Sequence, residues 1–181
     1  MGTEAASGVG ITSLYNAYGG KRELYLMALR HYTETRTRET LRRMDRLASP
    51  AARIRSFVVH VTEAALEDED RKGCLVINTA IELGPHDAQV AALVAEHLAE
   101  VEAFFLRNYE EALAKGQADP SVSPADAARA FSSMLFGLRV LARTRPDRAN
   151  MEGAVRPLLA LLKDEAGGPR KDDLLREKTE E

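Results

Sequence analysis

The sequence of 181 residues lacks the features that define several large classes of protein. Its single cysteine, Cys74, excludes an intramolecular disulfide and cannot supply the several thiolates of a cysteine-rich metal site. No apolar run has the length of a membrane span, and the start of the chain has no run of the signal-peptide type. We therefore expect a cytoplasmic protein that has no membrane partner.

A strong positive charge is also missing. The chain has 25 lysines and arginines against 28 aspartates and glutamates, so its formal net charge is -3. This balance argues against a broad, non-specific nucleic-acid binder. It remains compatible with a dimer that touches DNA through one small face.

Patterns typical of catalysis and of metal binding are absent as well. The four histidines, His31, His60, His86 and His97, lie on different segments and show no His-x-x-x-His spacing. No glycine-rich phosphate loop and no Gly-x-Ser-x-Gly motif occurs. We therefore expect no enzyme activity, no metal and no cofactor, and we rank an all-α enzyme far behind the interpretations below.

The residues that are abundant favour helices. Alanine, leucine, glutamate and arginine are frequent, and β-branched residues form no alternating runs. Hydrophobic residues make up 45% of the chain, which is enough to build a core. The composition therefore predicts an all-α fold.

The most informative stretch is Gly8 to Leu24. Gly8 and Gly10 give the backbone freedom of a tight turn between helices. Residues 11–18 then form a short amphipathic segment that Gly19-Gly20 ends. Lys21 begins the next helix, whose free N–H groups attract anions. A short polar helix between glycine turns is what reading the major groove requires.

This stretch resembles the second half of the helix-turn-helix of TetR-type transcriptional repressors. The pattern is Gly-Val-x-x-x-Ser-Leu-Tyr-x-x-Tyr-Gly-x-Lys-x-x-Leu, and it covers about one tenth of the chain directly. A weaker, independent similarity to ligand-binding domains of such regulators lies in Gly73 to Leu83. The resemblance implies a larger helical domain that binds small ligands and dimerises. Because such proteins usually carry a first helix before this point, we expect a helix-turn-helix module truncated at its N-terminus.

The resemblance also implies which residues contact DNA. The family's usual contact positions fall on Ile11, Thr12, Ser13, Tyr15, Asn16, Ala17 and Lys21. Asn16 can pair with adenine, whereas Tyr15 and Lys21 suit phosphate anchoring. Ala17 replaces the larger polar residue that often occupies its position. The alternative is a helical hairpin that reads no DNA.

Helix signals divide the rest of the chain. One long helix is expected from Lys21 to about Met44, and further helices follow Ser49, Gly73, Asp87 and Ser123. The helix from Gly73 to Leu83 is apolar nearly all round, so we expect it to be central and buried. A last helix is expected within residues 151–163, either starting just before Pro157 or kinked there. The predicted units are a DNA-binding module with its connecting helix at 1–44, a ligand-binding and dimerisation domain at 45–163, and a loosely attached charged tail at 164–181.

The larger domain is where a small molecule would bind, between helices and among apolar side chains. The candidate ligand-binding residues are Phe57, Val61, Cys74, Ile77, Phe104, Tyr109, Phe131 and Met134. For any single one of them, ordinary core packing is the competing interpretation.

Dimerisation is expected because a repressor of this type reads two half-sites. The last two helices also carry more apolar and small residues than one buried face needs. The predicted interface residues are Ser132, Ser133, Phe136, Gly137, Val140, Leu158, Leu159 and Leu162. We expect two copies of these helices to form a four-helix interface.

These observations favour a ligand-responsive transcriptional regulator, more often a repressor than an activator by resemblance. Its expected partners are a double-stranded DNA operator, a second copy of itself and a small-molecule effector. The alternative is a helical ligand-binding and dimerisation module whose DNA binding is impaired by N-terminal truncation. The operator, the effector and the regulated genes do not follow from the sequence.

Overall fold

The computed structural model describes residues 10–144 and 146–163 of the chain, and it describes them as helical apart from loops and one isolated bridge between Ala118 and Leu162. The expected all-α fold is therefore confirmed. The helices are α2 (Ile11–Tyr18), α3 (Lys21–Tyr32), the π-helix η1 (Thr33–Arg38), α4 (Glu39–Asp45), α5 (Pro50–Leu66), α6 (Leu75–Glu82), α7 (Ala88–Ala114), α8 (Pro124–Thr144) and α9 (Arg148–Leu159). The expectations for Gly8 and for the tail at 164–181 lie outside the described residues.

Capping side chains set several of these boundaries. Ser49 accepts a hydrogen bond from the Ala52 amide at the start of α5, and Asp87 accepts from the Gln89 and Val90 amides at the start of α7. Both caps use side-chain oxygens to pair backbone donors that have no partner within the helix. The N-terminal signals at Ser49 and Asp87 are therefore confirmed.

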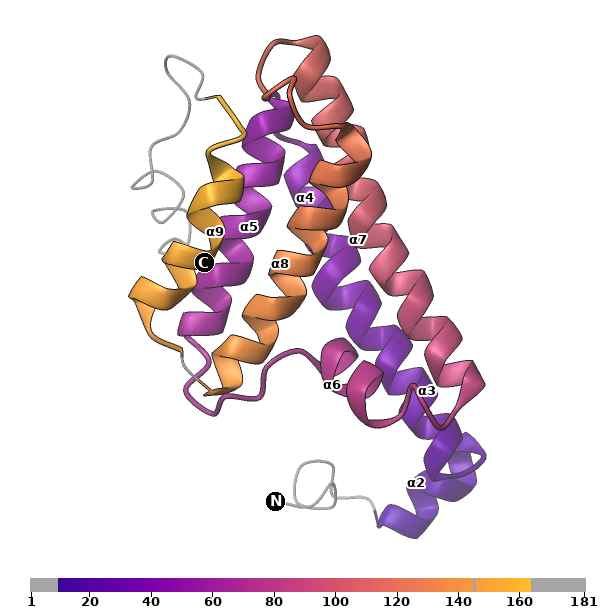
Figure 1. Cartoon of the computed structure of the whole chain (residues 1–181). Coiled ribbons are helices and arrows are strands. Elements are labelled where there is room, and N and C mark those ends of the chain that lie inside the picture. Colours follow the sequence, from indigo (N-terminus) through magenta and orange to yellow (C-terminus); the bar gives the residue numbers. More distant parts are fainter. Residues whose placement is uncertain (1–9, 145, 164–181) are drawn as a thin grey trace.

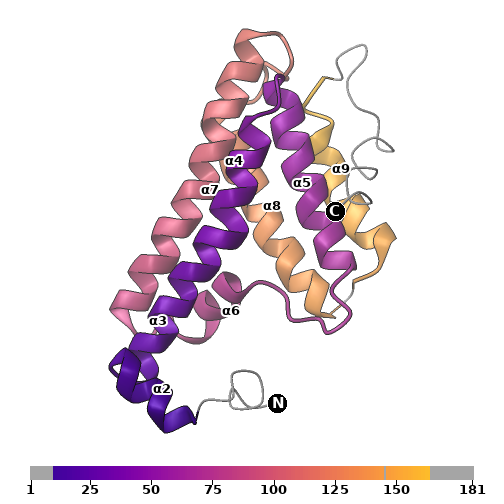
Figure 2. The same ribbon diagram turned by 180° about the vertical axis from the view of Figure 1, so that it is seen from behind.

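The helices form an elongated body with α2 at one end (Figures 1 and 2). The continuous helix α3–η1–α4 runs alongside α7, and α6 lies across the lower part of both. Helices α5, α8 and α9 pack together in the half of the body farthest from α2. The arrangement makes α3 the element that joins the short α2 to the rest of the bundle.

The main core lies among α5, α7, α8 and α9. Phe105 is fully buried, and its ring centroid lies 5.7 Å from that of Phe57, 5.5 Å from Phe104 and 5.2 Å from Phe131. A second, smaller cluster joins α3, α6 and α7 through Leu26, Leu29, Val76, Val90 and Val94. The core near α2 is thus separate from the core of the larger bundle.

Two helices differ from the sequence-based expectation. Helix α6 was expected to be central and buried, but its Ile81 side chain is 63% exposed while Val76 is buried. An apolar run this short cannot reveal which of its faces a neighbour covers. Helix α9 begins at Arg148, before the expected range, because Asp147 accepts a hydrogen bond from the Asn150 amide. The expected start just before Pro157 is wrong, and Pro157 lies inside the helix.

Candidate functional site

Helix α2 presents polar side chains to solvent at the end of the molecule. Thr12, Ser13, Asn16 and Ala17 are exposed, and Tyr15 is half-buried. The side chain of Ile11 lies outside the described part of the structure. Lys21 is exposed at the first turn of α3, next to α2 in space. The structure therefore brings the described members of the predicted DNA-contact set together on one small surface.

The turn between α2 and α3 depends on two glycines. Gly19 and Gly20 have φ angles of 79° and 122°, which side chains with a β-carbon rarely adopt. The amides of both residues donate hydrogen bonds to the Tyr15 carbonyl, which closes the end of α2. The glycine stop expected after Tyr18 is confirmed, and it fixes the angle at which α2 leaves α3.

Helix α3 is tied to the larger domain at two points. The Arg22 guanidinium donates two hydrogen bonds to the Asp87 carboxylate, at 2.9 and 3.0 Å, and this interaction lowers the pKa of Asp87. One turn farther along, the hydroxyls of Tyr25 and Thr79 lie 2.5 Å apart. The first contact reaches the N-cap of α7 and the second reaches α6, so both helices hold the element that carries α2.

A further contact links α6 to α8. The Arg143 guanidinium donates a hydrogen bond of 2.9 Å to the Asn78 side-chain oxygen. Asn78 is adjacent to Thr79 on α6, and Thr79 contacts Tyr25 on α3. Helix α6 therefore connects α8 to α3, the helix that follows α2.

The predicted ligand-binding residues fall into two places. Most belong to or pack against the main core, and of these Phe104, Tyr109 and Phe131 are fully buried. Cys74 and Ile77 lie on or beside α6, and the Cys74 thiol is 4.0 Å from the Tyr32 hydroxyl. The structure does not gather all eight around one space, so a shared ligand site for them stays a prediction.

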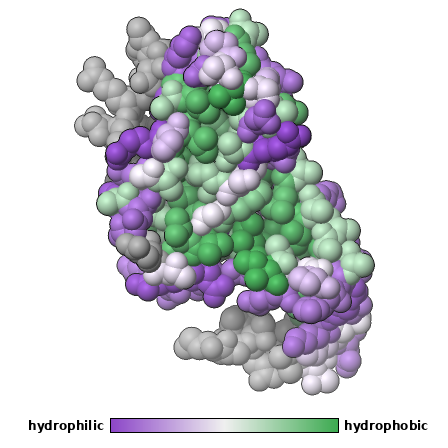
Figure 3. Space-filling model, in the orientation of Figure 1, coloured by the Kyte–Doolittle hydropathy of each residue, from purple (hydrophilic) through white to green (hydrophobic). Residues whose placement is uncertain are grey.

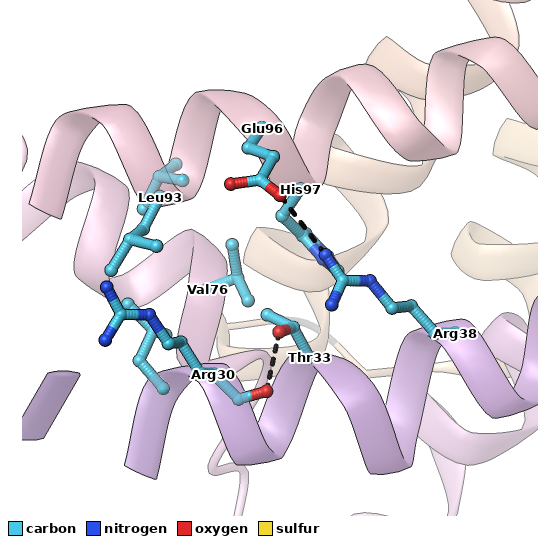
Figure 4. Close-up of a pocket in the computed structure, with 9 residues that line it drawn as sticks. Arg30, Thr33, Arg38, Val76, Leu93, Glu96 and His97 are labelled. Atoms are coloured by element: carbon cyan, nitrogen blue, oxygen red, sulfur yellow. Dashed lines mark hydrogen bonds and ion pairs between the residues drawn. The ribbon is translucent and has the colours of Figure 1, made fainter. Parts of the chain in front are cut away.

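A cavity of about 130 Å³ lies elsewhere, between α3–η1, α6 and α7 (Figure 4). None of the eight predicted ligand residues lines it. Its walls combine apolar, charged and hydrogen-bonding side chains from helices far apart in sequence. The lining residues are Leu29, Arg30, Thr33, Arg38, Val76, Leu93, Val94, Glu96 and His97.

Arg38 is held at one side of this cavity by carboxylates. It donates to Glu100 at 2.5 and 2.9 Å and to Glu34 at 3.1 Å, and Glu96 lies 3.4 Å away. The hydrogen bonds that Arg38 donates to Glu100 and then to Glu34 raise the pKa of Arg38, so this guanidinium stays charged. The π-helix η1 thus ends on a residue that is anchored to α7.

His97 lies in the same wall and is only 6% exposed. Its Nε2 is 3.4 Å from the Thr37 hydroxyl, whereas its Nδ1 is buried without a partner among the described residues. Burial lowers the pKa of His97 below its ordinary value of 6.5, so the ring is neutral near pH 7. His97 therefore brings to the cavity wall a ring whose Nδ1 has no hydrogen-bond partner in the part of the chain that the structure describes.

The predicted dimer residues divide by exposure. Ser133, Gly137 and Val140 are exposed at successive turns of α8, and Val140 is 45% exposed. Phe136, Leu158 and Leu159 are half-buried, whereas Ser132 and Leu162 are buried within the protomer. On the face seen in Figure 1, hydrophobic residues gather over α8 (Figure 3). This face combines apolar side chains with the small residues Ser133 and Gly137.

The larger domain matches a known family. Residues 50–158, more than half of the chain, match the family described as the tetracyclin repressor-like C-terminal domain. The chain belongs to the TetR family of transcriptional regulators. The resemblance read from the α2 region is thereby confirmed by a match to a different part of the chain.

Individual relatives of this TetR-family chain support the assignment. It is 28% identical over 156 residues to the uncharacterized HTH-type transcriptional regulator YezE of Bacillus subtilis (strain 168), covering 86% of this chain and 80% of the relative. It is 25% identical to the TetR-family regulator CifR, solved as a cysteine mutant with a 26-base-pair operator DNA. That comparison has a TM-score of 0.74 and covers 87% of this chain and 82% of CifR. A TetR-family regulator from Agrobacterium tumefaciens shares the fold, with a TM-score of 0.78 at 17% identity and coverage of 89% and 84%.

The described residues contain neither a candidate membrane span nor a candidate metal-binding group. None of the helices there is both long enough and apolar enough to cross a membrane. In the same residues, histidine, cysteine and acidic side chains form no group of three that could hold a metal ion.

The cavity around His97 was not predicted from the sequence. The one available signal was that His97 shares a helical face with Val90, Val94 and Val101, which places an imidazole among valines. Arg30 and Thr33 lie more than sixty residues earlier in the chain, and no local pattern connects them to α7.

Proposed function

We propose that this TetR-family regulator acts as a homodimeric repressor. In this proposal α2 binds double-stranded operator DNA, and a small molecule bound to the larger domain releases it. The observation that carries the proposal is the exposed polar surface formed by Thr12, Ser13, Asn16 and Lys21 at the end of the molecule. The similarity to CifR, solved with operator DNA, supports the same role.

The side chains of α2 divide into two roles. Asn16 offers a donor and an acceptor to a base edge, and the Thr12 and Ser13 hydroxyls pair with bases or phosphates. Lys21 stands at the N-terminus of α3, where its charge and the free backbone amides attract a phosphate. Bases are therefore read by α2 itself, and the backbone of the DNA is held from α3.

The apolar face of α8 supports the homodimer. Ser133, Gly137 and Val140 recur at helical spacing, and the two small residues permit close approach of a second helix. Phe136, Leu158 and Leu159 offer further apolar surface beside them. A two-fold axis through this face gives two copies of α2, as two operator half-sites require.

Release of DNA is assigned to the contacts of α3. A ligand that shifts α6 or α7 acts on Tyr25 through Thr79, or on Arg22 through Asp87. Either shift tilts α3 and changes the separation of the two α2 helices in the dimer. A ligand moves this equilibrium only as far as its affinities for the two geometries differ.

The test is selection of bound sequences from a random double-stranded DNA library by the purified full chain. The expected result is an enriched inverted repeat whose binding weakens steeply as salt rises, because phosphate contacts release counterions. Failure to enrich any sequence at low salt would overturn the proposal.

A reporter gene placed behind the selected sequence separates repression from activation. Expression that falls when the chain is produced supports a repressor. Expression that rises contradicts that part of the proposal and leaves a DNA-binding activator.

A further inference from the structure

Two polar groups at the cavity beside η1 have no partner within residues 10–144 and 146–163. The buried Nδ1 of His97 has no hydrogen-bond partner among the described residues, although buried polar atoms are nearly always hydrogen-bonded. The Arg30 guanidinium forms no hydrogen bond or ion pair with the described residues, in contrast to Arg38 in the same wall. Figure 4 shows Arg30 at one end of the cavity and His97 with Arg38 at the other.

The space between these groups is apolar. Leu29, Val76, Leu93 and Val94 line it, and the volume is about 130 Å³. A cavity of about 150 Å³ in another protein holds benzene, so this one takes a ligand of roughly six or seven heavy atoms, given that it is partly open. A short alkyl chain fits such a space.

The charges set the orientation of a ligand. Glu96 stands near His97 and Arg38, so a carboxylate is repelled at that end and attracted by Arg30 at the other. The group that reaches His97 must pair with Nδ1 whether this atom carries a hydrogen or not. A hydroxyl satisfies both cases, because it donates and accepts.

We propose that this cavity binds a short-chain hydroxycarboxylic acid, with its carboxylate on Arg30 and its hydroxyl on Nδ1 of His97. Such a ligand bridges α3, which carries α2, and α7. The binding site stands on its own, whereas its regulatory use rests on the proposed function. A bound acid fixes the spacing of α3 and α7 and thereby changes operator affinity.

The π-helix adds a structural reason for placing regulation here. Thr33 and Arg38, the first and last residues of η1, both line the cavity. Its wider hydrogen-bonding pattern interrupts the continuous helix between α3 and α4, and such interruptions frequently occur at functional sites. A ligand beside η1 therefore acts where the helix is least regular.

The binding test uses calorimetry on the full chain without DNA, with 4-hydroxybutyrate as the probe. We expect Arg30→Gln to weaken binding by about tenfold or more, because a charge-assisted hydrogen bond is lost. Arg36→Gln is the matched control, since Arg36 is an exposed arginine of η1 that does not line the cavity. It should bind as the wild type does.

The role of His97 is tested with butyrate, which lacks the hydroxyl. The wild type should bind butyrate more weakly than 4-hydroxybutyrate, and His97→Leu should remove this difference. The imidazole resonances of His97, followed by NMR, should shift on addition of the hydroxy acid. No saturable heat at about 10 mM probe, or equal losses in Arg30→Gln and Arg36→Gln, would overturn the proposed site.

Measuring operator affinity with and without 4-hydroxybutyrate tests whether the bound acid regulates DNA binding. A change of about fivefold or more supports it, and an unchanged affinity in a chain that binds the probe overturns it. A chain that binds the probe but selects no DNA sequence refutes the proposed function and leaves the site intact. A chain that selects DNA but binds no probe refutes only the site.

Discussion

Tyr25 on α3 donates its hydroxyl hydrogen to the Thr79 hydroxyl on α6, with 2.5 Å between the two oxygens. The direction follows from a second contact, because the Thr79 hydroxyl donates its own hydrogen to the Leu75 carbonyl at 2.7 Å. Thr79 is buried, so this short relay joins α3 to the backbone of α6 away from water. Together with the Arg22–Asp87 pair, it holds α3, and with it α2, against the larger domain.

Tyr25→Phe should lower the free energy of unfolding by about 1 kcal/mol, the net contribution of one hydrogen bond. Thr79 keeps its bond to Leu75 in this variant, so no buried donor is stranded. Urea unfolding of the wild type, Tyr25→Phe, Thr79→Val and the double variant gives the coupling between the two hydroxyls. Additive losses in the two single variants would show that the contact does not stabilise the fold.

His97 should make stability depend on pH in the weakly acidic range. Burial lowers its pKa in the folded chain, so the unfolded chain binds a proton first as pH falls below the ordinary value of 6.5. The free energy of unfolding should therefore decrease as pH is lowered from 7, by at most about 1.4 kcal/mol per pH unit. His97→Gln should show a flatter profile in urea unfolding between pH 5.5 and 7.5, and an unchanged slope would contradict the assignment.

Asn16 and Lys21 should affect DNA binding in different ways. Asn16→Ala should weaken binding to the selected operator by about 1–3 kcal/mol per half-site and leave non-specific binding unchanged. Lys21→Gln should weaken binding to all sequences and reduce the salt slope by about one per half-site. Arg46→Gln, at the exposed C-cap of α4, is the control for simple charge loss. If all three variants changed DNA binding in the same way, Asn16 would not be a base-reading residue and Lys21 would not be a phosphate-binding one.

Val140→Glu should convert the proposed homodimer into a monomer. Val140 is 45% exposed on α8, so a glutamate there needs no rearrangement of the protomer but places a charge in the apolar interface. Ile81→Glu is the matched control, since Ile81 is 63% exposed on α6 and lies outside the predicted interface. Sedimentation at micromolar concentration should show a dimer for the control and a monomer for Val140→Glu. A dimer in both would place the interface elsewhere.

Phe105→Ala should destabilise the larger domain by about 3–5 kcal/mol, because a buried aromatic ring leaves a cavity among three others. Thermal unfolding should show the loss, while Val140→Ala should change stability of the protomer by less than about 0.5 kcal/mol. A small effect for Phe105→Ala would indicate that this cluster adapts easily. In that case the neighbouring Phe57, Phe104 and Phe131 become stronger candidates for a ligand site.

Local signals made much of the fold predictable. The N-caps at Ser49 and Asp87 involve only amides two or three residues later in the chain, so a short stretch of sequence predicts them. The end of α2 after Tyr18 depends only on the backbone freedom of the glycines there. The start of α9 was predicted wrongly because the prediction rested on Pro157. The helix is instead capped by Asp147, ten residues before that proline. Local chemistry predicts where helices begin when the capping residue itself is recognised.

The candidate sites were predictable only in part. The exposed polar face of α2 follows from its amphipathic pattern, since Thr12, Ser13 and Asn16 all lie within one short helix. The cavity does not follow from any local pattern, because Arg30 and His97 line the same space only after α3 packs near α7. The exposure of Ile81 could not be predicted either, since apolar residues lie on several sides of the short helix α6 and do not show which side is uncovered.

The π-helix η1 lets the continuous helix α3–η1–α4 contain one residue more than a regular α-helix with the same number of turns. Its inward positions, Leu29, Thr33, Thr37 and Leu41, recur every four residues, and a regular α-helix would complete the same three turns in about eleven residues rather than twelve. Loss of Thr35 from the gene would therefore restore a regular helix while α3 and α4 both kept their faces toward the bundle. Loss of one residue in the middle of α7 would instead rotate everything beyond it by about 100°. Among descendants of this protein, single-codon changes in length should be tolerated in η1 and rejected in α7.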